Sequence, residues 1–257
     1  MPFPALTVEQ FQTFFWILLR ISIVLFFLPM FGARGLPTMW KVALSMVMAG
    51  VFSLAHSSPP PPTSNLTYFV LALGSELLLG IVLAIGVRFL FASVQLAGQF
   101  LGFQMGFNMA SVMDPQTGGQ SSVMAQFLYL FMVLIFFSVD GHHIFIRALS
   151  YSFEVIPPGS FELSASIVGG LVKVSNQMFV LALKLAAPVM IGLFLSNLCL
   201  GIVARTVPQV NILMVGFPLN IGLGMILLGL TMSSLAPFFV SIVKAMGQVL
   251  MMILKGP

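Results

Sequence analysis

The fold is decided by residues 163–204, LSASIVGGLVKVSNQMFVLALKLAAPVMIGLFLSNLCLGIVA, which contain two lysines and no acidic residue. A polar segment, RTVPQVN at 205–211, follows, and residues 208–252 are again apolar. As a helix rising 1.5 Å per residue, the first arm would be roughly 60 Å long, about twice the thickness of a bilayer's hydrocarbon core. The sequence therefore predicts a long helical hairpin whose arms bend or project beyond the bilayer into a protein assembly.

The composition of the whole chain is that of a membrane protein. Of its 257 residues, 59% are hydrophobic and only 6% are Asp, Glu, Lys or Arg, and the mean hydropathy is +1.11. A soluble domain carries about 25% charged residues, so these few charges could not cover a water-facing globule of this size. We therefore predict an all-α integral membrane protein made of long, kinked helical hairpins. The basic residues are scattered singly, which argues against a nucleic-acid partner.

Further charge-poor stretches predict additional membrane helices. The region 141–162 differs from them, because it holds three charged residues and the sequence PPG, and we expect it to be interfacial or a loop. The break at 114–122, DPQTGGQSS, separates two of the predicted spans. The predicted spans before the hairpin are 11–29, 42–55, 66–87, 89–113 and 123–139.

The predicted helix at 89–113 carries small residues every fourth position beside a series of carboxamides. Small residues at this spacing allow another helix backbone to approach closely. Carboxamides are costly against lipid tails, so they should face protein or water. The alternative is ordinary helix packing within one subunit. The small residues are Gly98, Gly102, Gly106 and Ala110, and the carboxamides are Gln95, Gln99, Gln104 and Asn108.

The loop after this helix, residues 106–122, begins with apolar residues and ends with a proline- and glycine-rich turn. A loop this apolar could fold back as a constriction, because narrow apolar pores exclude hydrated ions. It could equally be a tight connector whose apolar half simply ends the helix. The candidate plug residues are Gly106, Phe107, Met109, Val112, Met113, Asp114, Pro115, Gly118 and Gly119.

The remaining ionisable residues indicate structure rather than chemistry. Glu76 lies within an apolar run and could pair with Lys184 in a protein core. In the sequence DGHH, the adjacent histidines should point to different faces of a helix, and we expect Asp140 to cap that helix. We therefore expect no metal site. The chain contains none of the common nucleotide-binding or hydrolytic motifs, so we expect no cofactor and no enzymatic activity.

Four motifs resemble the FliR family of flagellar export-gate proteins, and the likeness covers essentially the whole chain. The motifs are MGFNMASVMDP at 105–115, FFSVDGH at 136–142, GIVARTVPQVN at 201–211 and GFPL at 216–219.

The resemblance implies a non-enzymatic core subunit of the flagellar type III protein export gate, in the inner membrane part of the flagellar basal body. Such a subunit joins FliP and FliQ homologues, surrounded by membrane lipid, around a passage for unfolded flagellar proteins. Residues 1–162 would be FliP-like, with the plug at 106–122, and residues 163–257 would form a FliQ-like hairpin. Its tip would contact an FlhB-type switch protein through Arg205, Pro208, Gln209 and Asn211.

Three alternatives remain at this point. The chain could be the equivalent subunit of a virulence injectisome, whose export proteins are related. It could be a self-contained transporter, although such proteins usually contain internal repeats and we find none. It could also be a passive membrane scaffold, which the apolar loop argues against.

Overall fold

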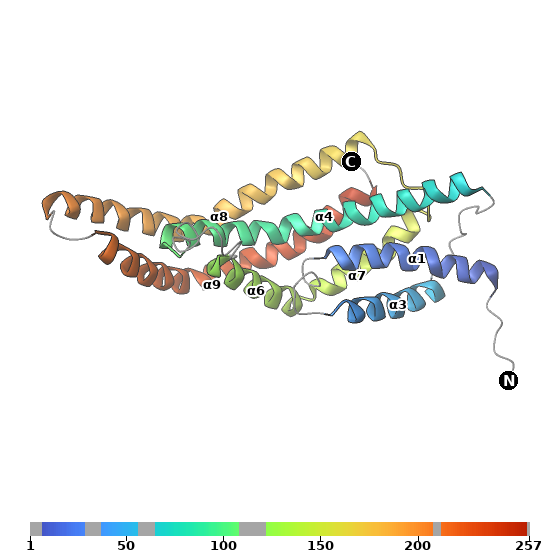
Figure 1. Ribbon diagram of the computed structural model, residues 1–257, viewed down its shortest axis with the longest axis horizontal. Coiled ribbons are helices and arrows are strands. Elements are labelled where there is room, and N and C mark those ends of the chain that lie inside the picture. The colour runs from blue at the N-terminus through green and yellow to red at the C-terminus, as the bar shows by residue number, and fades with distance from the viewer. Residues whose placement is uncertain (1–6, 29–36, 56–64, 108–121, 208–211, 256–257) are drawn as a thin grey trace. The chain divides into compact units, whose positions relative to one another are not determined.

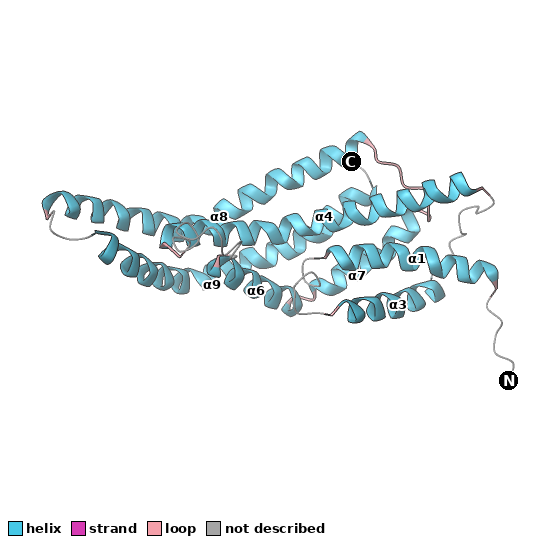
Figure 2. Cartoon of the chain, in the orientation of Figure 1, coloured by secondary structure: helices cyan, strands magenta, loops and turns pink. Residues whose placement is uncertain are grey.

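The computed structural model describes residues 7–28, 37–55, 65–107, 122–207 and 212–255. Within these ranges the chain forms seven helices and no strand (Figures 1 and 2). The all-α prediction is therefore confirmed. The helices are α1 (Val8–Phe27), α3 (Thr38–Ala55), α4 (Leu66–Met105), α6 (Val123–Ser138), α7 (Gly141–Val155), α8 (Ala165–Thr206) and α9 (Ile212–Lys255).

Five of these helices, α1, α3, α4, α8 and α9, are long and apolar enough to cross a membrane. Helices α6 and α7 reach that length only as a pair interrupted at Val139 and Asp140, which would bring the number of spans to six. The described residues thus have the fold class of an integral membrane protein.

The chain contacts divide the protein into two compact units, and neither unit is continuous in sequence. Unit 1 contains Met1–Phe89, Asp140–Ser175 and Lys244–Pro257, whereas unit 2 contains Leu90–Val139 and Asn176–Val243. Helices α4, α8 and α9 each contribute to both units. The predicted division after residue 162 concerns likeness to FliP and FliQ; it stays a prediction.

Helix α4 corrects the expectation of two spans at 66–87 and 89–113. It is one continuous helix of 40 residues that passes through Arg88. The side chain of Arg88 is exposed, so the helix can continue through it without burying a charge. No proline or turn sequence ends the helix there. A single charge separated the two apolar runs in the sequence without separating them in the structure.

Helix α7 corrects a second expectation in part, since residues 141–155 form a regular helix rather than a loop. One face of α7 is buried and contains Phe145, Ala148, Leu149, Ser152 and Phe153, which follow helical spacing. The loop expected in this region is limited to the residues after Val155, where Pro157 and Pro158 cannot continue the helix.

Unit 1 is built around α1, which packs along α3. The helix begins with a capping box, in which the Thr7 hydroxyl accepts from the Gln10 N–H and the Gln10 side chain accepts from the Thr7 N–H. Its buried face includes Trp16, whose ring meets Phe69 of α4 edge to face at 5.7 Å. This packing fixes the position of Arg20, one turn further along the same face.

Candidate functional site

The predicted plug loop is described only at its two ends. Gly106 and Phe107 follow α4, and Ser122 precedes α6. The other predicted plug residues, Met109, Val112, Met113, Asp114, Pro115, Gly118 and Gly119, lie outside the described residues. The structure therefore defines where the loop is attached.

The first attachment is the end of α4 against α9, within unit 2. Gly106 has a φ of +87°, a backbone angle that residues other than glycine rarely adopt. A Cβ at this position would lie 2.5 Å from the ring of Phe217. The preceding Met105 is fully buried, and its Cγ lies 2.8 Å from where a Cβ of Gly224 would be. Glycine at both 106 and 224 thus allows α4 to end directly against α9.

The second attachment is the start of α6 against α4, also within unit 2. The Ser122 hydroxyl donates to the Gly98 carbonyl oxygen at 3.5 Å, at the limit of a hydrogen bond. A Cβ at Gly98 would lie 2.7 Å from the backbone nitrogen of Ala125, so only glycine permits this approach. Both ends of the loop are consequently held at α4, eight residues apart and about 12 Å along the helix axis.

The small residues and the carboxamides of α4 behave differently. Gly98 and Gly102 are buried, and the close approach at Gly98 is to α6 of the same chain. Gln95 and Gln99 are exposed. The small residues therefore serve packing within this chain, while a role for the carboxamides in contacts with other subunits stays a prediction.

The side-chain oxygen of Gln104 is a further polar group near the start of the loop. This Oε1 is buried, and among the described residues it has no hydrogen-bond partner. A buried carboxamide oxygen without a hydrogen-bond donor is costly. We therefore expect another part of the chain or an assembled partner to donate a hydrogen bond to it.

Helices α8 and α9 form the hairpin expected from the sequence, with the turn between Thr206 and Ile212 (Figure 1). Within unit 2 a polar cluster joins them. Asn220 of α9 accepts from the Ser196 hydroxyl at 3.0 Å and donates to the Asn197 side-chain oxygen at 2.6 Å. This cluster was not among the predictions from the sequence. A signal was present, because 197 and 220 lie at nearly equal distances on either side of the turn.

The tip of the hairpin is described on one side only. Arg205 lies exposed in the last turn of α8, where a positive charge favours the helix carbonyl end. Pro208, Gln209 and Asn211 lie outside the described residues. Their contact with a partner stays a prediction.

Glu76 does pair with a base, but the expected partner was wrong. Its carboxylate accepts from Arg20 Nη2 at 2.7 Å and from Nε at 2.8 Å, and both side chains are fully buried in unit 1. Lys184 is exposed and belongs to unit 2. The sequence could not identify Arg20, because several isolated bases were possible partners.

The Arg20–Glu76 pair also holds the end of α7. Arg20 Nη1 donates to the Ser152 carbonyl at 2.9 Å, and Nη2 donates to the Ile156 carbonyl at 3.0 Å. Glu76 Oε1 accepts from the Gly159 N–H at 2.9 Å. The pair thus joins α1 and α4 to the C-terminal end of α7 and to the residues that follow it, so its role is structural.

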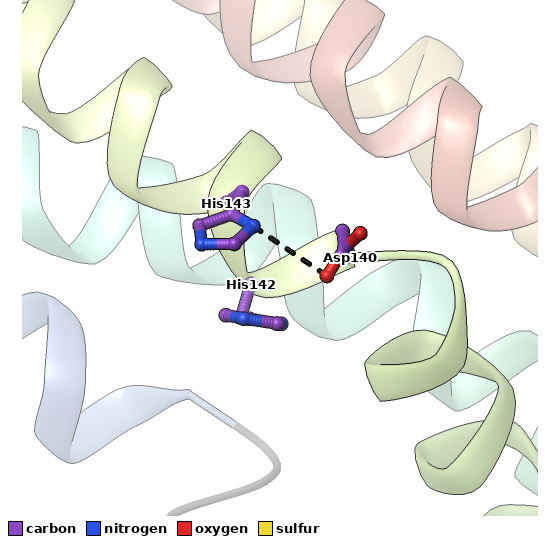
Figure 3. A group of neighbouring side chains, drawn as sticks. All are labelled: Asp140, His142 and His143. Atoms are coloured by element: carbon purple, nitrogen blue, oxygen red, sulfur yellow. Dashed lines mark ion pairs between the residues drawn. The ribbon is translucent and has the colours of Figure 1, made fainter.

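The DGHH sequence begins helix α7 but lacks the side-chain contact of an ordinary helix cap. Asp140 does occupy the N-cap position of α7, as expected, but it has a φ of +55° and its side chain makes no capping hydrogen bond, so the expected cap is wrong for the side chain. The two histidines were also expected to diverge, yet their ring centroids are 4.2 Å apart. Asp140, His142 and His143 lie together at the start of α7 (Figure 3).

Comparison with known proteins places these elements in a family. Residues 11–246 match the family model described as "Bacterial export proteins, family 1". The chain is 38% identical over 232 residues to the flagellar biosynthetic protein FliR of Bacillus subtilis, covering 88% of each chain. It is 32% identical to FliR of Escherichia coli, covering 88% of this chain and 86% of the relative, and 30% identical to FliR of Aquifex aeolicus, covering 83% and 82%.

Proposed function

The chain belongs to family 1 of the bacterial export proteins, and from this premise we propose that it forms part of the core of the flagellar protein export gate. Its class is that of a membrane-bound subunit of the flagellar type III export apparatus. The proposal adds that it lies in the bacterial inner membrane, has no enzymatic activity, and lines the passage for unfolded flagellar proteins together with FliP and FliQ homologues. The family favours this function over an injectisome subunit or a self-contained transporter.

The observation that carries the proposal is the incomplete burial of the hairpin. Helices α8 and α9 contain 42 and 44 residues, and the chain buries only 28% of the most apolar part of each. At about 1.5 Å per residue each is more than 60 Å long, so lipid tails can cover only about half of its length. Apolar surface beyond the bilayer must be covered by protein, which requires partner subunits.

The attachments of the loop support a plug rather than a tight connector. The two ends at Phe107 and Ser122 are joined by 14 residues, 108–121. Fourteen extended residues reach about 46 Å, far more than the roughly 12 Å between the attachment points on α4. The loop is therefore long enough to leave α4, enter a passage and return. Its methionines and Val112 would supply an apolar surface that excludes hydrated ions.

The exposed Arg205 at the hairpin tip supports a contact with the FlhB-type switch protein. In this proposal Arg205, Pro208, Gln209 and Asn211 present a polar surface at the end of two apolar arms. A photocrosslinker at Gln209 is expected to capture that protein in a motile strain. Capture of lipid alone there would remove the tip contact and leave the gate proposal intact.

Copurification tests the central part of the proposal. Extracted in mild detergent, the chain should copurify with its FliP and FliQ homologues, and without them it should aggregate or be degraded. A folded, monodisperse monomer would contradict the proposal. Gln95→Leu and Gln99→Leu test the contact with partner subunits more directly than Gly102→Leu does. Gly102 is buried within this chain, whereas both glutamines are exposed and available to a partner.

Deletion of residues 109–119 tests the plug separately. In the assembled complex this deletion should raise the resting leak of small ions across the inner membrane, measured as conductance at equal complex abundance. An unchanged leak would mean that the loop is a connector and that the partner subunits close the passage.

A further inference from the structure

The start of α7 gathers three side chains of the kind that bind metal ions. One ligand atom from each of Asp140, His142 and His143 lies within 4.8 Å of the others. Nδ1 of His143 lies 3.5 Å from Oδ1 of Asp140, and Figure 3 shows this ring and this carboxylate facing each other. All three residues belong to unit 1, so the cluster does not depend on how the two units are placed.

The backbone at Asp140 explains how a carboxylate comes to lie beside these rings. Asp140 is the only residue other than glycine with a positive φ among the described residues. An ordinary N-cap residue is extended and aims its side chain at the helix N–H groups. Asp140 is left-handed instead and makes no such hydrogen bond, so its carboxylate remains available beside His143.

We propose that Asp140, His142 and His143 bind one divalent transition metal ion of the Zn²⁺ class. Two imidazole nitrogens and one carboxylate oxygen are a donor set that suits Zn²⁺, Co²⁺, Ni²⁺ or Cu²⁺, whereas Mg²⁺ and Ca²⁺ require mainly oxygen ligands. Three protein ligands leave one position of a tetrahedral ion open for water or for a fourth ligand from an assembled partner.

The geometry fits such an ion after small side-chain rotations. Ligands about 2.0–2.2 Å from a tetrahedral Zn²⁺ lie about 3.3 Å from one another. The Asp140–His143 pair at 3.5 Å is already near that separation. The side chains of His143 and Asp140 are 60% and 72% exposed, so they can rotate to close the wider separations and an ion can reach them without unfolding.

The charges at the site also fit a cation. With both imidazoles neutral, the three ligands carry one negative charge from Asp140. This charge offsets the positive end of the α7 dipole, which would otherwise disfavour a cation there. A bound ion would hold Asp140 and the first turn of α7 in one conformation.

The test uses the full chain in its detergent-solubilised complex, purified with an affinity tag that lacks histidine. Co²⁺ serves as the spectroscopic probe, and Zn²⁺ affinity is measured by competition with a chromophoric chelator. One equivalent of Co²⁺ should give visible bands of a low-coordinate site. His142→Gln and His143→Gln should each weaken Zn²⁺ binding by at least about tenfold, since ligand loss should cost no less than loss of an outer-shell partner. His56 is the third histidine of the chain and is not part of the proposed site, so His56→Gln is the matched control and should leave Zn²⁺ binding unchanged.

A second variant separates ligation from folding. His143→Cys removes the imidazole but keeps a zinc ligand, so it should retain Zn²⁺ binding where His143→Gln loses it. Equal Zn²⁺ affinity in the parent and in both glutamine variants would overturn the proposal, as would the absence of Co²⁺ bands in the folded complex. If the glutamine variants do not fold, the folded His143→Cys variant decides: a new cobalt–thiolate charge-transfer band with Co²⁺ would support the proposal, whereas loss of metal binding, or metal binding without that band, would overturn it.

Discussion

Helices α4 and α8 are almost equal in length, with 40 and 42 residues, but the chain covers them very differently. Within the most apolar stretch of each helix, the chain buries 61% of the residues of α4 but only 28% of those of α8. These two stretches are almost equally hydrophobic. Apolar character therefore does not decide which helix is covered by its own chain.

The glycines illustrate this difference. On α4, a Cβ at Gly80 would lie 2.6 Å from Ile23, and one at Gly98 would meet the backbone of α6. On the hairpin, Gly201, Gly222 and Gly229 have nothing within 4 Å of a Cβ position. Gly80 and Gly98 of α4 are thus packed within this chain, as are Gly192 and Gly224 of the hairpin, whereas Gly201, Gly222 and Gly229 of the hairpin leave room for the close approach of another helix.

The largest effect is expected at the ion pair between α1 and α4. Arg20→Met should destabilise the complex by about 3–5 kcal/mol, because it leaves the Glu76 charge buried without a partner. The measurement is denaturant unfolding of the purified complex. The double variant Arg20→Met with Glu76→Leu should be more stable than Arg20→Met alone. A double variant at least as unstable as the single one would mean that the carbonyl contacts of Arg20, rather than the charge pair, hold unit 1 together.

A smaller effect is expected at the α4–α6 contact. Gly98→Ala should cost about 1–3 kcal/mol, because the methyl group would meet the Ala125 backbone, which cannot move without displacing α6. Gly74→Ala on the same helix is the matched control. It has open space, so it should stabilise the helix by up to about 1 kcal/mol. Equal thermal stability of the two variants would contradict the distinction between packed and open glycines.

The smallest effect is expected at the polar cluster of the hairpin. Asn220→Leu should cost about 0.6 kcal/mol and at most about 1.7 kcal/mol, the average and the largest value found for hydrogen bonds between membrane helices, because it removes the contacts to Ser196 and Asn197. Thermal unfolding of the complex measures this cost. A loss as large as that of Arg20→Met would mean that the hairpin, like unit 1, depends mainly on contacts within the chain.

The sequence predicted what local pattern determines. Long charge-poor stretches identified the membrane helices, and the polar RTVPQVN segment located the hairpin turn. The expectation of a break at Arg88 was wrong, because a charge at an exposed position does not end a helix.

Contacts between distant residues could not be predicted. Arg20 and Glu76 are 56 residues apart, and nothing local distinguishes Arg20 from the other isolated bases. The left-handed backbone at Asp140 was missed for a related reason. An Asp before a helix is usually an extended cap, and nothing in the local sequence marks Asp140 as an exception.

The central claim is that partner subunits cover the apolar surface of the hairpin. Photocrosslinking at two nearby positions of α8 tests this claim most directly. Ile191 is 61% exposed in this chain, and Leu193, two residues later, is fully buried. In membranes containing the assembled apparatus, a crosslinker at Ile191 should capture a FliP or FliQ homologue, while one at Leu193 should give only adducts within the chain. Lipid adducts alone at Ile191, at normal abundance of the complex, would contradict the account.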